Sequence, residues 1–184
     1  LIVIAAFSLF TLYNDYLQRN AIRHNLDNYL HEMGSVTANN IHTWLGGRIL
    51  LAQNLAESIA LTPEPAQVAN LLEQKTLSST FMAVYFGDSQ GGFTIRPNSK
   101  MPDGYDPRTR PWYKDALNSA ASSLTEPYID AATGQMVISI GAPVRIAGQT
   151  LGVVGADLTL QTITDSINAL NFNGMGYAFL ISAD

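Results

Sequence analysis

The sequence predicts an α+β fold in which one long helix precedes a small antiparallel sheet. Three observations support this prediction. Apolar residues recur every three or four positions from residue 14 to about residue 60, which is the period of a helix. From residue 81 the period changes to two, which is the period of strands. Turn sequences then separate the strands at short intervals, as in an antiparallel meander.

The first thirteen residues, LIVIAAFSLFTLY, carry no charge. A membrane-spanning helix needs about 20 apolar residues, so this run predicts either the end of such a helix or the first turns of a buried one. Residue 1 is Leu and not Met, so we expect this chain to be part of a longer protein. Tyr13 and Tyr16 lie where aromatic residues at a membrane surface are found. We therefore assign 1–13 to the end of a transmembrane helix.

Residues 14–60 are predicted to form a stalk helix. The segment contains no proline, and at about 1.5 Å per residue it would be near 70 Å long, which exceeds a compact domain of this size. Its three histidines lack a carboxylate cluster, so we interpret them as surface or interface residues rather than metal ligands. The two prolines of LTPEPAQ (61–67) end the helix because they remove backbone donors.

Residues 61–172 are predicted to form one module. A short helix is expected over 66–79, another in PWYKDALNSA, and a third over 159–171. About five antiparallel strands are expected in the segments FMAVYFGD, FTIRP, SLTEPYIDA, QMVISIGAPVR and TLGVVGADLTL. The last segment, GYAFLISAD, predicts the opening strand of a second module, which we assign to 173–184.

Composition and motifs exclude several classes of function. The net charge of −5 argues against a nucleic-acid-binding surface, which needs a basic stripe. The absence of cysteine excludes disulfides, thiolate metal sites and cysteine nucleophiles. No metalloprotease, serine-hydrolase or phosphate-loop motif is present. We therefore expect neither an enzyme nor a bound cofactor or metal.

Acidic residues stand where apolar ones are expected. Asp157 lies in the otherwise apolar GVVGADL, and a buried carboxylate is costly unless it is paired. It either caps the helix that follows the strand or awaits a cation. Tyr128 and Asp130 are two apart and would share one face of a strand. Alternatively, Asp130 starts the turn at 131–134 and the tyrosine only packs.

The segment YDPRTRPWY (105–113) crowds arginines and aromatic residues into a proline-punctuated loop and the start of the helix expected in PWYKDALNSA. Arg108, Arg110 and Trp112 share one parity, so spacing alone does not choose between the two arginines. The segment is either an aromatic anchor with surface arginines or half of a binding site. An α-amino acid would suit the second reading, because arginine and an indole N–H bind its carboxylate while acidic and aromatic side chains bind its ammonium.

Three segments in this order carry a family resemblance: YDPRTRPWY, TEPYIDAATGQMVISIGAPV and GVVGADLTL, which follow a long helix containing WLGGR. Residues 14–184 resemble the extracytoplasmic double Cache domain of bacterial chemoreceptors, and more narrowly its amino-acid-sensing subgroup. The resemblance implies a PAS-like membrane-distal module that holds a ligand between its sheet and its loops.

The resemblance also implies a ligand site of seven residues: Tyr105, Arg110, Trp112, Tyr113, Tyr128, Asp130 and Asp157. The arginine and the tryptophan would hold the ligand carboxylate. The last three residues would take the ammonium, and the two remaining tyrosines would line the pocket. Arg108 would tie the loop to its own domain.

On this resemblance the domain would lie in the periplasm, be anchored in the bacterial inner membrane, bind an L-amino acid and pair with a second copy through the long helix. Three alternatives stay open. The same fold could sense an amine or a small carboxylic acid. It could serve a histidine kinase or a cyclase instead of a chemoreceptor. It could also be an interaction module that binds no small molecule.

Overall fold

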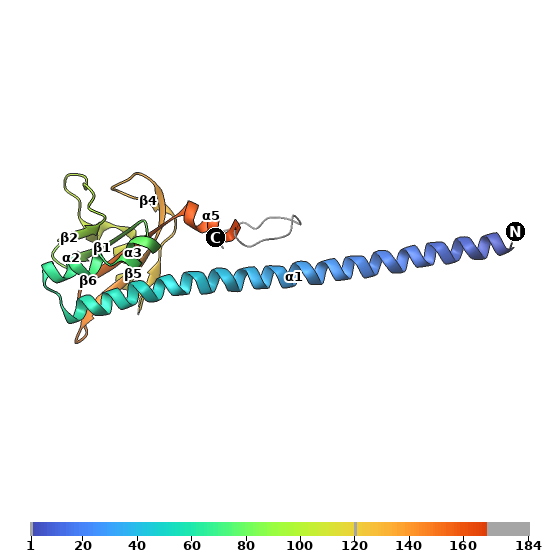
Figure 1. Cartoon of the computed structure of the whole chain (residues 1–184), viewed down its shortest axis with the longest axis horizontal. Helices are drawn as coiled ribbons and strands as arrows, with labels where there is room; N and C mark the ends of the chain where they lie inside the picture. Colours follow the sequence, from blue (N-terminus) through green and yellow to red (C-terminus); the bar gives the residue numbers. More distant parts are fainter. Residues whose placement is uncertain (1, 120, 169–184) are drawn as a thin grey trace. The chain divides into compact units, whose positions relative to one another are not determined.

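The computed structural model describes residues 2–119 and 121–168, and they form an α+β fold (Figure 1). The chain divides into two compact units, Leu1–His42 and Thr43–Asp184, and the boundary in the sequence falls within the first helix. The expected strand at 176–184, and with it the assignment of 173–184 to a second module, lies outside the described residues.

The first helix, α1, runs from Ile2 to Leu61, so the long helix expected over 14–60 is present and begins earlier. It ends before Pro63, as the two prolines of the following segment predict. None of the helices in the described part of the chain has an apolar stretch long enough for a bilayer span. The assignment of residues 1–13 to a transmembrane helix therefore stays a prediction.

The single helix expected over 66–79 is in fact two, α2 (Pro65–Leu72) and α3 (Lys75–Thr80). Gln74 has extended backbone angles and separates them. The reason lies in the spacing of the buried residues. Leu72 and Leu77 are five apart, which is not a helical period, and the break lets both side chains enter the core.

The six strands form one antiparallel sheet in the order β2-β1-β6-β5-β3, and β4 pairs farther along β5. Their bounds are Ala83–Asp88 for β1, Phe93–Arg96 for β2, Ser123–Leu124 for β3, Tyr128–Ile129 for β4, Met136–Ile146 for β5 and Gln149–Thr159 for β6. The one strand expected in SLTEPYIDA is thus two short ones. Pro127 interrupts them because it cannot donate to the ladder.

The two faces of the sheet are covered by different helices. Residues 44–60 of α1 pack with α2 and α3 against one face, through apolar side chains such as Ile140 and Val154. The other face lies beneath a short 3₁₀ turn, η1 (Pro107–Thr109), and α4 (Pro111–Asn118). The last described helix, α5 (Leu160–Asn168), follows β6 directly. The second face carries the polar residues that the sequence singles out.

Candidate functional site

Asp157 lies in the middle of that second face. It is inside strand β6, directly opposite Ser139 of β5 and Ala83 of β1, and only 1% of it is exposed. It does not cap the following helix, because the hydroxyl of Thr159 accepts the hydrogen bond from the backbone N–H of Thr162. Of the two readings of Asp157, the helix cap is therefore excluded.

One carboxylate oxygen of Asp157 accepts two hydrogen bonds. Its Oδ1 accepts hydrogen bonds of 2.5 Å from the hydroxyls of Tyr85 and Ser139. Burial raises the pKa of this carboxyl to about 6, although the two hydroxyl donors oppose the rise and nearby Asp130 adds to it. The carboxylate is thus costly to hold in its charged form and is supported on one oxygen only.

The second oxygen, Oδ2, accepts no hydrogen bond within the described chain. In the described part of the chain, two side-chain polar atoms are fully buried without a hydrogen-bond partner, Nε of Arg48 and Oγ of Ser123. Oδ2 of Asp157 is not one of them. Oδ2 therefore keeps a small exposed area, although only 1% of the residue as a whole is exposed. A buried carboxylate with one open acceptor oxygen is suited to a cationic group.

The ring of Tyr85 lies over a glycine of the neighbouring strand, and this position lets its hydroxyl reach Oδ1 of Asp157. Its register partner on β6 is Gly155, and a Cβ added there would come within 1.8 Å of the tyrosine ring. No other residue type would leave room for the ring. Ser139 is held from the other side, because its N–H donates to Oγ1 of Thr125 at 3.0 Å and its carbonyl accepts from the N–H of Thr125 at 3.0 Å.

Tyr128 of β4 extends the network outward. Its hydroxyl lies 2.7 Å from Oγ of Ser139, and the guanidinium of Arg110 lies 5.5 Å from the centre of its ring. Burial raises the pKa of Tyr128, and the charge of Asp157 raises it further, so the phenol keeps its proton at neutral pH. The ring joins the acidic and the basic parts of the cluster.

The two arginines of YDPRTRPWY have different surroundings. Arg108 forms an ion pair with Asp106, with Nη2 2.8 Å from Oδ2, which agrees with its expected role in tying the loop. Arg110 is the N-cap of α4 and donates from Nη2 to the carbonyl of Ile129 at 2.9 Å. It forms no ion pair with any described residue, so its other N–H groups are available to an anion.

Aromatic rings pack against one another beside these charged groups. Trp112 is buried and packs edge-on against Tyr85 at 4.7 Å, while Tyr105 packs on Phe93 at 4.8 Å. Burial raises the pKa of Tyr105 to about 12, against the lowering effects of Arg110 and of a hydrogen bond donated by the Trp112 indole N–H. Tyr105 therefore lies close to both arginine and tryptophan.

Asp130 and Tyr113 have other contacts than the sequence implies. Oδ2 of Asp130 accepts from the N–H and the hydroxyl of Thr133, at 2.7 and 2.6 Å, which is the turn role left open above. Its Oδ1 stays free within the described residues, and its charge acts on Asp157. The hydroxyl of Tyr113 donates to the carbonyl of Asp88 at 3.4 Å instead of joining the network.

Of the six predicted residues other than Asp157, five therefore lie in the cluster around it, and Tyr113 is turned to the β1–β2 turn. Sequence reasoning missed Tyr85 and Ser139. Both carry a recognisable signal. Each is a polar group at an inward position of an alternating, otherwise apolar strand, and each shares its face with the site.

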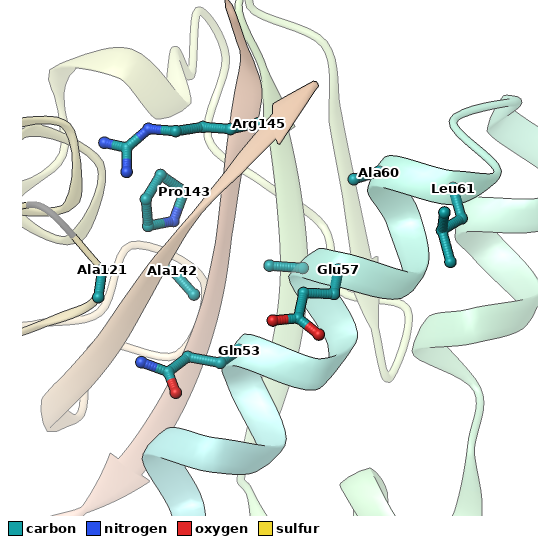
Figure 2. Close-up of a pocket in the computed structure, with 9 residues that line it drawn as sticks. Gln53, Glu57, Ala60, Leu61, Ala121, Ala142, Pro143 and Arg145 are labelled. Carbon is teal, nitrogen blue, oxygen red and sulfur yellow. The ribbon is translucent and has the colours of Figure 1, made fainter. Parts of the chain in front are cut away.

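A separate groove of about 660 Å³ lies between the end of α1 and the edge of β5 (Figure 2). Gln53 and Glu57 face Ala142 and Pro143 across it. No cluster of three or more potential metal-ligating side chains occurs in the described ranges 2–119 and 121–168. The polar network around Asp157 is therefore the candidate site.

Comparisons with known proteins identify the family of the chain. Residues 51–165 match the family model described as methyl-accepting chemotaxis protein-like, first PDC sensor domain. The chain is 58% identical over 182 residues to the methyl-accepting chemotaxis protein McpG of Pseudomonas putida, and this match covers 99% of the chain. The chain spans only 28% of that relative's length.

Two solved structures are similar over most of the chain. The ligand-binding domain of the Pseudomonas fluorescens chemoreceptor CtaA, in complex with L-valine, is 65% identical with a TM-score of 0.84, covering 88% of this chain and 73% of that one. The corresponding domain of PctB of Pseudomonas aeruginosa, in complex with L-Arg, is 50% identical with a TM-score of 0.83, covering 88% and 69%.

These relatives are sensor domains and not enzymes, and the resemblance to chemoreceptor sensors is confirmed. The family match covers the sheet, α4 and every residue of the candidate site. The chain belongs to the family of first PDC sensor domains found in methyl-accepting chemotaxis protein-like receptors.

Proposed function

We propose that this chain is the extracytoplasmic sensor of a chemoreceptor and that it binds L-amino acids. One observation carries the proposal. An arginine without an ion-pair partner in the described chain and a buried carboxylate with an open oxygen act on each other across one face of the sheet. Arg110 and Asp157 thus present complementary charges to a zwitterion.

The groups divide into two ends. Arg110 offers paired N–H donors to the ligand carboxylate, with the indole N–H of Trp112 beside it and Tyr105 near both. Oδ2 of Asp157, the hydroxyl of Tyr128 and the free oxygen of Asp130 receive the ammonium. The rings of Tyr105 and Tyr128 contribute aromatic faces between the two ends. Tyr113 supports the loop rather than the ligand.

The relatives support this class of ligand. The similar structures of CtaA and PctB hold L-valine and L-Arg, whose side chains differ in size and charge. What the two ligands share is the α-carboxylate and the α-ammonium. A site that recognises these two groups explains how one fold serves both ligands.

The rest of the receptor is also a proposal, because the chain spans less than a third of McpG. In this proposal residues 1–13 end a transmembrane helix in the bacterial inner membrane, and the sensor lies in the periplasm. A second copy pairs with it along α1, whose Ile22, Leu26 and Leu30 are exposed in the single chain. The named chemotaxis relatives favour a chemoreceptor over a histidine kinase or a cyclase.

The test is a thermal-shift series with L-valine, its decarboxylated form isobutylamine and its deaminated form isovalerate, beside a screen of the twenty amino acids. A ligand at a hundredfold excess over its Kd stabilises the folded chain by about 2.7 kcal/mol. We expect an amino acid to raise the melting temperature and the one-ended analogues to fail. No shift with any of the twenty would refute the proposal and favour an interaction module. A shift with the amine or the acid alone would assign the alternative ligand.

A further inference from the structure

The hydroxyl of Ser139 has a fixed place in the network. The residue is fully buried, and Thr125 holds its backbone through two hydrogen bonds of 3.0 Å. Its Oγ lies 2.5 Å from Oδ1 of Asp157 and 2.7 Å from the hydroxyl of Tyr128. Ser139 therefore forms hydrogen bonds with both of these groups. Tyr85 belongs to the same network, because its hydroxyl donates to Oδ1 of Asp157 and lies 3.3 Å from Oγ of Ser139.

The direction of each hydrogen bond follows from the number of protons. A serine hydroxyl has one proton, and an ionised carboxylate can only accept. Ser139 therefore donates to Asp157, so its own oxygen must accept from Tyr128. The proton of Tyr128 is then engaged with Ser139, and the phenol oxygen offers only acceptor lone pairs to any further partner.

We propose that Ser139 is a positioning residue that turns Tyr128 into an acceptor for the ligand ammonium. By binding Oδ1 of Asp157 it also leaves Oδ2 as the open oxygen. The ammonium, which has three donors and no acceptor, then meets two acceptors rather than a competing phenol proton. This inference rests on the proposed function, because it assigns a role at the ammonium end of that site.

The same arrangement makes binding sensitive to pH. The groups that face Asp157 are Tyr85 from β1, Ser139 from β5, Tyr128 from β4, Asp130 after β4, and Tyr105 and Arg110 from the loop before α4. Burial raises the pKa of Asp157 to about 6, and the Ser139 hydrogen bond lowers it. Affinity for an ammonium should therefore fall as the pH drops through about 6, and loss of the serine hydroxyl should move that midpoint upward.

The experiment measures L-valine affinity by calorimetry between pH 5 and 8 for the full chain and for Ser139→Ala and Ser139→Thr. We expect Ser139→Ala to weaken binding about tenfold at pH 7, which corresponds to one lost hydrogen bond. Its pH midpoint should shift upward, whereas Ser139→Thr keeps a hydroxyl and should stay within about threefold of the parent. A loss that is equal at every pH would show a merely structural role and overturn the proposal, as would no loss at all.

A second arm needs no ligand. Carbon-13 NMR titration of the Asp157 carboxyl should give a higher midpoint in Ser139→Ala than in the parent chain, and an unchanged midpoint would overturn the proposed network. This arm separates the two inferences. If the chain binds none of the twenty amino acids but shows the shifted midpoint, the proposed function is refuted. The proposed hydrogen-bond directions from Tyr128 to Ser139 to Asp157 would still stand.

Tyr128→Phe covers the case in which Ser139→Ala does not fold. It removes the acceptor oxygen but leaves the hydrogen bond between Ser139 and Asp157 in place. We expect L-valine binding to weaken about tenfold while the Asp157 midpoint stays where it is. Unchanged affinity in this variant would contradict an ammonium contact at Tyr128.

Discussion

The two faces of the sheet differ in chemistry at positions that are equally buried. Ile140 and Leu158 face the helices and are 0% and 1% exposed, while their chain neighbours Ser139 and Asp157 face the loops and are also 0% and 1% exposed. On the helix face the buried side chains contribute hydrophobic free energy. On the other face burial has to be offset by hydrogen bonds, and Asp157 is left with one oxygen unpaired.

This difference indicates that burial alone does not tell a stabilising position from a functional one. A core residue is explained by its packing. An acidic residue with the same burial raises the free energy of the unliganded state unless something pairs with it, so its presence points to a ligand. The four predictions below test this contrast, beginning with the largest expected effect.

Ile140→Ala should destabilise the packing between the sheet and the helices that cover its first face. It deletes a fully buried side chain packed against α1–α3, and such a change lowers the free energy of unfolding by about 2–5 kcal/mol. Urea unfolding measures the loss. At a temperature where the variant is folded, its amino-acid affinity should match the parent. Ile146→Ala, at an exposed position of the same strand, should have little effect, and an equal loss in both variants would contradict the assignment.

Asp157→Asn, on the other face, should change stability in the opposite direction, because it removes a buried charge instead of a buried apolar side chain. The native pKa of about 6 lies above the usual 3.8, so between about pH 4 and 6 the folded chain holds more protons than the unfolded chain. The free energy of unfolding should therefore fall as pH rises through this window, by about 3 kcal/mol in total for a shift of about two units.

The asparagine can still accept from Tyr85 and Ser139 but carries no charge. We therefore expect Asp157→Asn to be at least as stable as the parent at pH 8, to lose the slope between pH 4 and 6, and to bind no amino acid. Chemical unfolding across this pH range checks the first two results. If the free energy of unfolding had the same pH slope in the parent and the variant, Asp157 could not be a buried carboxyl with a raised pKa.

Arg110→Ala should weaken L-amino-acid binding about a hundredfold, because two charge-assisted hydrogen bonds to the carboxylate are lost. Isothermal calorimetry with L-valine is the measurement. Arg108→Ala is the matched control from the same segment. Its arginine pairs with Asp106 at the surface, so we expect less than about a fivefold change. Equal effects of the two changes would show that the loop, not Arg110 itself, determines affinity.

Tyr113→Phe should have the smallest effect. Its hydroxyl makes one long hydrogen bond of 3.4 Å to the carbonyl of Asp88, and its ring contacts Trp112. We expect the free energy of unfolding to fall by at most about 1 kcal/mol and the affinity to stay unchanged. A tenfold weaker affinity would return Tyr113 to the pocket lining that the family resemblance implies.

Much of the fold was predictable because it depends on local patterns. The long helix, the strands and the alternation that assigns each strand residue to a face follow from periods of 3.6 and two within single segments. The breaks were not predictable in the same way. The split between α2 and α3 serves the burial of Leu72 and Leu77, and a core is not visible in one segment.

The sequence by itself determined that acidic and aromatic residues interrupt apolar strands, and that Arg110 and Arg108 were both candidates. The family resemblance favoured Arg110, but only the tertiary structure shows the physical difference, because Arg108 pairs with Asp106 and Arg110 forms no ion pair with a described residue. The tertiary structure also decided that Ser139 and Asp157, eighteen residues apart, are register partners, and that Tyr85 joins them from a position 72 residues away. Strand register sets those distances, and register depends on how separate segments pack and pair.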